Sequence, residues 1–381
     1  MSEYGIATKC LYGDGKKVDC DSSGAISFPI YQTATFAHPA VGESTGFDYS
    51  RLQNPTRAQL ENIIASLEGG NDAVAFSSGM AAVTALMEIF SPGDHIITDQ
   101  DLYGGTIRLF DNINEKNGIK FSHIDFNTEN PEEYINENTR AIYFETPTNP
   151  MMNVTDIKAM AEIAHRHGLL LIVDNTFMSP YFQNPLKLGA DIVVHSGTKF
   201  IGGHNDTIAG FLVTSQKEIG EKLRYIIKTV GSGLAPFDSW LILRGVKTLP
   251  LRMEKAQSNA FELVKWLQNN EHVVKVYYPG IPENPGYEVC KRQASGFGSM
   301  ITIEVDSKEL ALNVLKSVKL IHFAESLGGT ETLITYPVTQ THADVPKDVL
   351  EKNGINDRVL RISVGIEDPA DLINDLLNAF R

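Results

Sequence analysis

The chain has 381 residues, of which 42% are hydrophobic and 21% charged, a composition typical of a globular protein with a full hydrophobic core. Its 33 basic side chains stand against 47 acidic ones, which gives a formal net charge of −14. A field of that sign disfavours nucleic acids and anionic membrane surfaces as partners, although it leaves room for a local pocket that binds a small anion.

No segment of the sequence predicts export or membrane insertion. Residues 1–14 contain no apolar stretch of the kind that a secretory signal requires. The longest aliphatic run, residues 169–173, is far too short to span a bilayer. The cysteines, Cys10, Cys20 and Cys290, lack the spacing of metal ligands. We therefore expect free thiols, a cytoplasmic location and no metal site.

The first 55 residues lack sustained periodicity and contain Pro29, Pro39 and Pro55. We expect them to form an extended arm, with short irregular pieces, that either wraps its own domain or contacts a neighbouring subunit. The pattern changes at Thr56, whose side chain is suited to capping a helix over residues 56–67.

From residue 56 onwards, apolar strands alternate with helices. A helix that ends near Phe90 is followed by helices at 105–117 and 155–167, and the predicted strands lie at 73–76, 95–98, 121–125, 141–144, 169–173, 191–194 and 208–213. Continuous apolar strands separated by helices indicate an α/β fold with a mainly parallel sheet covered on both faces.

The C-terminal part has a different pattern. A long helical stretch is expected from Pro236 to about residue 270, followed by the strands 273–278, 300–305 and 360–364 and the helices 310–318 and 370–380. This mixture predicts a smaller α+β domain. We therefore divide the chain into an arm (1–55), a large domain (56–250) and a small C-terminal domain (251–381).

Polar residues follow two of the apolar strands directly. Asp174 ends one strand, and the next strand leads through Ser196 and Thr198 to Lys199. Ligands of open α/β sheets bind at the carboxyl ends of the strands, so one pocket is expected to hold an acid, an amine and two hydroxyls. Pyridoxal phosphate (PLP) requires that set of groups. A structural ion pair between Asp174 and Lys199 explains these two residues about equally well.

Two further segments favour the PLP interpretation. Gly79 and Met80 lie between a strand and the start of a helix, where free main-chain N–H groups attract phosphate. Tyr103 also follows a strand, and its ring is suited to stacking on a planar cofactor; a half-buried tyrosine at a cleft is the ordinary alternative. A dinucleotide fold is disfavoured, because no G-x-G-x-x-G follows the first strand and Pro236 interrupts the nearest partial match.

These motifs resemble those of a known family. Asp174-Asn175-Thr176, Ser196-Gly197-Thr198-Lys199-Phe200 and Gly202-Gly203-His204-Asn205-Asp206 resemble the Cys/Met-metabolism PLP enzymes of fold type I, which include cystathionine γ-synthases, cystathionine γ- and β-lyases, methionine γ-lyases and O-acetylhomoserine sulfhydrylases. The likeness extends over nearly the whole chain, from residue 30 to residue 365.

The resemblance implies a role for each matching residue. Lys199 would form the Schiff base with PLP and move protons, Asp174 would pair with the pyridine nitrogen, and Tyr103 would stack on the ring. The phosphate would be held by Gly79, Met80, Ser196 and Thr198, and by Tyr49 and Arg51 of a neighbouring subunit. The family therefore implies a homotetramer built from two dimers. The substrate α-carboxylate would be bound by Arg361 with Asn149 and Ser326.

The sequence gives less information about which reaction the protein catalyses than about its cofactor. Gly105 stands where methionine γ-lyases usually carry cysteine, and Glu325 before Ser326 resembles synthases and γ-lyases. Asp48 and Glu325 could receive the distal ammonium group of a substrate, or could be solvated rim charges. We expect γ-replacement on O-acylhomoserine by cysteine, as in cystathionine γ-synthase. The alternatives are elimination by a cystathionine γ- or β-lyase and, more remotely, an aminotransferase or a non-catalytic binding protein.

Overall fold

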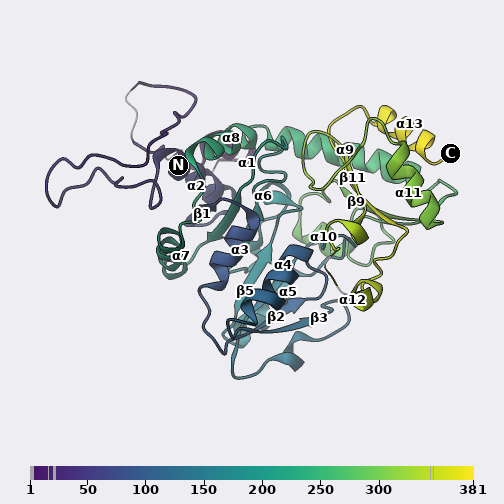
Figure 1. Ribbon diagram of the computed structural model, residues 1–381, viewed down its shortest axis with the longest axis horizontal. Coiled ribbons are helices and arrows are strands. Elements are labelled where there is room, and N and C mark those ends of the chain that lie inside the picture. Colours follow the sequence, from purple (N-terminus) through teal and green to yellow (C-terminus); the bar gives the residue numbers. More distant parts are fainter. Residues whose placement is uncertain (1–3, 16, 20–22, 344, 346) are drawn as a thin grey trace.

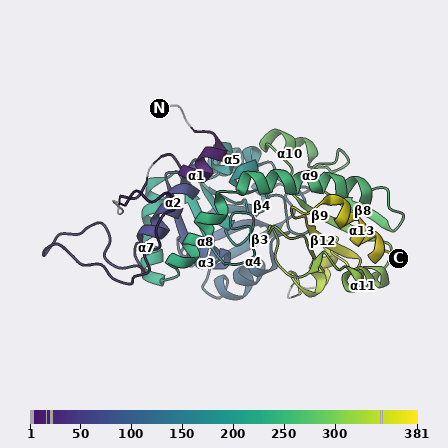
Figure 2. The ribbon, with the colours of Figure 1, turned by 90° about the horizontal axis from the view of Figure 1, so that it is seen from above.

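The computed structural model describes residues 4–15, 17–19, 23–343, 345 and 347–381, so Cys20 lies outside the described residues. Two β-sheets, each with helices packed against it, lie side by side, and the segments that precede α2 (Pro55–Glu68) project from the first of them (Figures 1 and 2). No helix among the described residues is long and apolar enough to cross a membrane.

The central sheet contains seven strands in the order β1-β7-β6-β5-β4-β2-β3. Strands β2 to β6 pair in parallel, whereas β7 is antiparallel to both of its neighbours. The prediction of a mainly parallel sheet is therefore confirmed. The strands are β1 (Asp72–Phe76), β2 (His95–Asp99), β3 (Lys120–Ile124), β4 (Thr139–Glu145), β5 (Leu170–Asp174), β6 (Ile192–Ser196) and β7 (Gly210–Thr214).

Alternate residues of these apolar strands enter two cores, one on each face of the sheet. In β5, Leu171 and Val173 pack into one core and Ile172 packs into the other, as the two-residue period of a strand requires. Helices α2, α5 (Ile157–Arg166) and α8 (Pro236–Val246) contribute to the first core. Helices α3 (Gly79–Met87), α4 (Gly104–Leu109) and α7 (Lys217–Val230) contribute to the second.

The second sheet has five strands in the order β10-β11-β12-β9-β8, and its core is shared with three helices on the C-terminal side of the chain. Helices α9 (Leu249–Leu267), α11 (Lys308–Ser317) and α13 (Pro369–Ala379) pack on it, which agrees with the expected α+β arrangement. Its strands are β8 (Val273–Tyr277), β9 (Met300–Val305), β10 (His322–Phe323), β11 (Leu333–Thr335) and β12 (Val359–Ser363).

The remaining helices are short. They are α1 (Ile6–Tyr12), α6 (Ser179–Phe182), α10 (Tyr287–Gln293), α12 (Lys347–Lys352), the π-helix η1 (Phe110–Asn114) and the 3₁₀ turns η2 (Pro131–Tyr134), η3 (Pro185–Leu188) and η4 (Pro337–Thr339). Within the arm, α1 is a regular helix that the sequence did not predict. It forms because Cys10 and the Lys9 stem are buried, as α1 packs against α2.

Two predicted helices differ from those observed. The helix expected at 105–117 is α4 followed by the π-helix η1, and the long helical stretch from Pro236 is divided between α8 and α9. Pro250 lies in the first turn of α9 and has no N–H to donate to the preceding turn, so α8 cannot continue through it.

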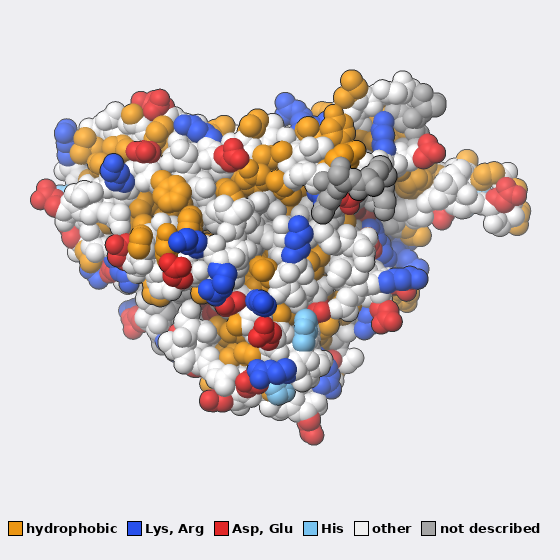
Figure 3. Space-filling model, turned by 180° about the vertical axis from the view of Figure 1, so that it is seen from behind, with side chains coloured by type: hydrophobic (Ala, Val, Ile, Leu, Met, Phe, Trp, Pro, Cys, Tyr) orange, Lys and Arg blue, Asp and Glu red, His pale blue; other side chains and the backbone are white. Residues whose placement is uncertain are grey.

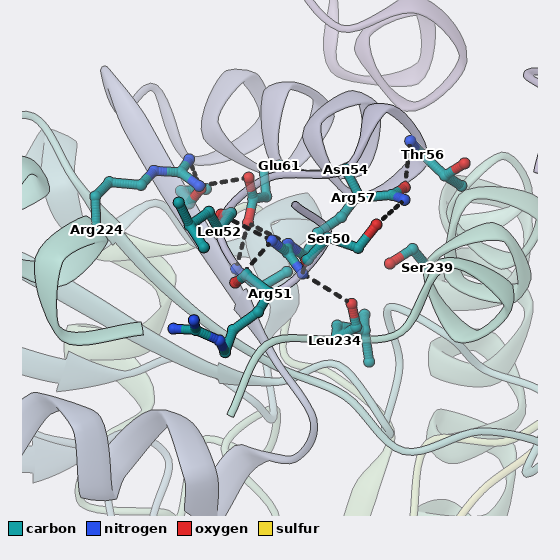
Figure 4. A network of polar contacts seen from close by, with 12 residues as sticks. Ser50, Arg51, Leu52, Asn54, Thr56, Arg57, Glu61, Arg224, Leu234 and Ser239 are labelled. Atoms are coloured by element: carbon teal, nitrogen blue, oxygen red, sulfur yellow. Dashed lines mark hydrogen bonds and ion pairs between the residues drawn. The ribbon is translucent and has the colours of Figure 1, made fainter. Parts of the chain in front are cut away.

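The base of the arm is attached to α2 by hydrogen bonds (Figure 4). The Asn54 side chain accepts from the Thr56 N–H at 3.0 Å and donates to the Tyr31 carbonyl at 2.9 Å. The buried guanidinium of Arg57 donates to the Ser50 carbonyl at 2.9 Å. These contacts fix where the arm leaves the body, and the described residues that precede this base in the chain include loops that extend outward (Figure 1).

Arg224 of α7 joins the start of the central sheet to α2. Its guanidinium lies 2.6 Å from a carboxylate oxygen of Glu61, which is buried, and 2.6 Å from one of Asp72. The other Glu61 oxygen accepts from the Ala75 N–H of β1 at 2.9 Å. Arg57 lies farther away, with its Nε 3.7 Å from the same Glu61 oxygen, so Arg224 makes the closer of the two ion pairs with Glu61.

We predict that Arg224→Ala lowers the free energy of unfolding by about 2–3 kcal/mol, because it leaves the buried Glu61 carboxylate partly uncompensated. Lys217→Ala is the matched control on the same helix, since it removes an exposed pair with Glu221 that contributes only about 0–0.5 kcal/mol. Denaturant unfolding followed by circular dichroism measures both changes. Equal effects of the two substitutions would contradict this assignment.

Candidate active site

A cavity of about 800 Å³ lies where the carboxyl ends of β4, β5 and β6 face the start of α3 and the second sheet. Eleven of the fourteen residues that the sequence singled out line it: Gly79, Met80, Tyr103, Asn149, Asp174, Ser196, Thr198, Lys199, Glu325, Ser326 and Arg361. Both halves of the chain therefore contribute to one site.

Lys199 lies in the turn after β6. Its N–H donates to the Ser196 carbonyl at 3.2 Å and its carbonyl accepts from Gly203 at 2.7 Å, so the main chain is fixed. Its ammonium group donates to the Ser326 hydroxyl at 2.7 Å. Burial, together with the charge of Arg361, lowers the pKa of Lys199 to about 8. Its amine can therefore gain and lose a proton near neutral pH.

Asp174 ends β5 and projects into the same cavity. One of its carboxylate oxygens accepts from the Thr176 N–H at 2.9 Å. Burial raises the pKa of Asp174, and hydrogen bonds from the Thr176 hydroxyl and N–H act in the opposite direction. A buried carboxylate with its own donors is suited to hold a ring N–H cation.

The start of α3 forms an anion cradle. Ser78 caps this nine-residue helix by accepting from the Ala81 N–H at 3.0 Å, which leaves the N–H groups of Gly79 and Met80 without helical partners. A Cβ at Gly79 would lie 3.1 Å from the Ser196 Cβ, so only glycine fits easily beside β6. Ser196 and Thr198 line the same cavity, and the Thr198 hydroxyl donates to the Ala209 carbonyl at 3.2 Å.

Arg361 of β12 is buried, with 1% of its surface exposed. Its guanidinium donates to the Asn149 side chain at 2.7 Å and to the Ser326 carbonyl at 2.9 Å, while its Nε has no hydrogen-bond partner among the described residues. Burial lowers the pKa of Arg361 to about 10, so it stays cationic at neutral pH. A fixed guanidinium with a free N–H is suited to a carboxylate ligand.

Tyr103 lies in the loop between β2 and α4 and is 40% exposed. Its N–H donates to the Glu145 carboxylate, which fixes the main chain at the cavity wall. A Cβ at position 105 would lie only 2.5 Å from the Tyr103 ring. The ring occupies the space that any side chain at position 105 would need.

Asp48, Tyr49 and Arg51 do not line the cavity of their own chain. Arg51 donates to the Lys228 carbonyl and lies 5.5 Å from the centre of the Tyr49 ring. Asp48 accepts from Ser44 at 2.6 Å and lies 3.6 Å from His38. The expectation that Asp48 stands at the mouth of the cavity is therefore not met within one chain.

Several residues that line the cavity were not predicted from the sequence. Glu145 ends β4 as Asp174 ends β5, and the same rule, an acid directly after an apolar strand, would have found it. Thr176 belongs to the quoted Asp174 motif but was given no role. Asn205 and Asp206 likewise belong to a quoted motif but were given no role. The other polar residues of the lining were not predicted; they are Ser78, Thr106, Thr207, His322 and Thr341.

The residues present fit PLP. An amine, a buried carboxylate and a phosphate cradle are arranged around one cavity with an aromatic ring at its wall, and each matches one part of the cofactor. Within the described residues, no group of three or more His, Cys, Asp or Glu side chains is placed to hold a metal ion.

The comparisons agree with this site. The family model described as Cys/Met metabolism PLP-dependent enzyme matches residues 7–381. Two relatives from Bacillus subtilis (strain 168) are each 48% identical to this chain. One is a cystathionine γ-lyase, aligned over 93% of this chain and 94% of the relative. The other is a cystathionine γ-synthase/O-acetylhomoserine (thiol)-lyase, aligned over 100% and 97%.

A solved structure shows the same fold. The cystathionine γ-lyase of Lactobacillus plantarum, complexed with L-serine, superposes with a TM-score of 0.96 at 43% identity, over 99% of this chain and 98% of that one. The match covers both sheets and every segment that lines the cavity. The chain therefore belongs to the Cys/Met metabolism PLP-dependent enzymes, and PLP is its cofactor.

Proposed function

We propose that the protein catalyses γ-replacement on an O-acylhomoserine, in which cysteine displaces the acyloxy group and cystathionine is formed. One observation supports the binding of an amino-acid substrate, which the lyase alternative shares. Ser326 accepts a hydrogen bond from the Lys199 amine through its hydroxyl and from Arg361 through its carbonyl. An amino acid whose carboxylate binds Arg361 would therefore have its Cα beside the Lys199 amine.

Bound PLP supplies an aldehyde that links to amines and an electron-poor ring that accepts the electrons released at Cα. The chain supplies the rest. Asp174 would keep the ring nitrogen protonated, and the α3 cradle with Ser196 and Thr198 would hold the phosphate. Tyr103 would stack on the ring. Lys199, whose pKa is about 8, would remove the Cα proton and then a Cβ proton as the acyloxy group leaves; after the thiol has added at Cγ, one proton returns to Cβ and one to Cα.

Two features support replacement within this family. Gly105 stands where methionine γ-lyases usually carry a cysteine, which argues against that activity. Glu325 lines the cavity beside Ser326, where its charge suits the distal ammonium group of cysteine or cystathionine. The alternative is elimination from cystathionine by a γ- or β-lyase, which uses the same binding residues. Family membership leaves the aminotransferase and non-catalytic hypotheses without support.

A product-resolved assay separates replacement from elimination. We expect O-acetyl- or O-succinylhomoserine plus cysteine to give cystathionine faster than cystathionine alone gives pyruvate or 2-oxobutyrate. Glu325→Gln should raise the KM for cysteine more than the KM for the ester, because only cysteine brings a second ammonium group to that side chain. If cystathionine alone is turned over faster than the ester plus cysteine, the protein is a lyase and the proposed replacement activity is wrong.

The protein is further proposed to work as a homotetramer of two dimers in the cytoplasm. Tyr49 and Arg51, which lie outside the cavity of their own chain, would reach the phosphate of the neighbouring subunit. Hydrophobic side chains are visible on the projecting segment in Figure 3. Ile26, Val41 and Tyr49, which precede α2, are exposed, and exposed apolar side chains support an intersubunit role. The free thiols of the buried Cys10 and Cys290 support a reducing compartment.

Mixed oligomers test whether Arg51 acts across subunits. Lys199→Ala and Arg51→Ala chains, each impaired alone, should regain activity when co-expressed, since a hybrid dimer contains one site with both residues intact. A mixture of Lys199→Ala and Asp174→Asn chains is the matched control, because those residues share one cavity and no intact site can form. Absence of recovery in purified Arg51 hybrids would show that Arg51 does not act in the site of the neighbouring subunit.

A further inference from the structure

Two carboxylates lie side by side at the bottom of the cavity. Glu145 and Asp174 are the last residues of β4 and β5, and they are paired directly in the sheet register. Both line the cavity, and only 8% of Glu145 is exposed. Neighbouring strands of a sheet lie about 4.7–4.9 Å apart, so the two carboxyl groups enter the cavity close together.

Two negative charges this close cannot both persist in a buried site without compensation. The charged groups that face Glu145 are mostly acidic. Asp174 acts from β5 and Asp99 and Asp101 act from the end of β2 and the loop after it, whereas Arg361 of β12 is the cation on which Glu145 acts. Burial and the charge of Asp174 raise the pKa of Glu145 well above its usual range.

The hydrogen bonds decide which of the two carboxyl groups keeps its charge. Asp174 receives two donors from Thr176, its N–H at 2.9 Å and its hydroxyl, and it would also face the protonated ring nitrogen of the cofactor. Glu145 receives the Tyr103 N–H as its hydrogen-bond donor. Since donors stabilise a carboxylate, the negative charge belongs on Asp174 and the proton on Glu145.

We propose that Glu145 is a positioning residue that remains a neutral carboxylic acid in the holoenzyme, leaving Asp174 as the ionised partner of the cofactor ring and fixing the Tyr103 main chain. The inference rests on the role proposed above for Asp174 and adds a second acid with the opposite protonation state. One oxygen of Glu145 accepts from Tyr103, and its O–H is a donor on the cavity side.

Infrared difference spectroscopy of the PLP-loaded enzyme observes this proton directly. A protonated carboxylic acid has a C=O stretch that a carboxylate lacks and that shifts in deuterated water. We expect the spectrum of wild-type minus Glu145→Gln holoenzyme to contain that band at neutral pH. Asp174→Asn is the matched control, because it makes the same change of carboxyl to amide on the adjacent strand, and the corresponding difference should contain only carboxylate bands.

Cofactor retention tests the positioning role. Glu145→Ala removes the acceptor for the Tyr103 N–H and should weaken PLP binding about tenfold or more, the scale typical of outer-layer partners in metal centres. Glu145→Gln keeps an acceptor and a donor, so its affinity for PLP should be close to that of the wild type. Spectroscopic titration of the apoenzyme with PLP measures both constants, and circular dichroism checks that each variant is folded.

The outcomes separate this inference from the proposed function. Absence of the acid band from the wild-type minus Glu145→Gln difference, or PLP binding by Glu145→Gln as weak as by Glu145→Ala, overturns the neutral-acid role and leaves Asp174 unaffected. If Asp174→Asn binds PLP with the wild-type spectrum and affinity, the assignment of Asp174 fails instead. Should Glu145→Ala not fold, the infrared comparison still decides the question.

Discussion

Lys199 and Asp174 lie in one buried cavity at the carboxyl edge of the central sheet, and each needs partners that only the surrounding elements supply. A buried ammonium group loses its hydration, which lowers its pKa and makes it a proton carrier near neutral pH. A buried carboxylate becomes easier to protonate, so it requires donors such as those of Thr176 to stay ionised. The arrangement of the site follows from satisfying both requirements in one space.

The second sheet completes the cavity rather than forming a separate site. Arg361 enters from β12 and Ser326 from the loop that precedes β11, while Asn149 comes from the segment after β4. A carboxylate bound to Arg361 therefore lies between the two sheets and beside Lys199. The hydrogen bonds Lys199–Ser326 and Arg361–Asn149 join residues 127 and 212 positions apart, which explains why the whole chain is needed for one site.

Much of this could be predicted from the sequence, because apolar strands followed by polar residues are a local signal. Asp174, Lys199 and Gly79 were found in that way, and the parallel sheet follows from the same alternation of strands and helices. Asp48, Tyr49 and Arg51 lie outside the cavity of their own chain, and a place beside a neighbouring subunit's cavity, as proposed for Tyr49 and Arg51, is not encoded in a local pattern. The role of Glu145 depends on the register between β4 and β5, and the break between α8 and α9 required attention to a single proline.

The roles proposed for the site depend on a covalent linkage between the PLP aldehyde and the side-chain amine of Lys199. Borohydride converts a lysine–aldehyde linkage into a stable secondary amine, so reduction of the holoenzyme followed by peptide mapping identifies the attachment site. We expect one modified peptide, which contains Lys199, and no modified peptide from the Lys199→Ala variant treated in parallel. Modification of a different lysine in active enzyme, or an active enzyme with no modified peptide, would contradict it.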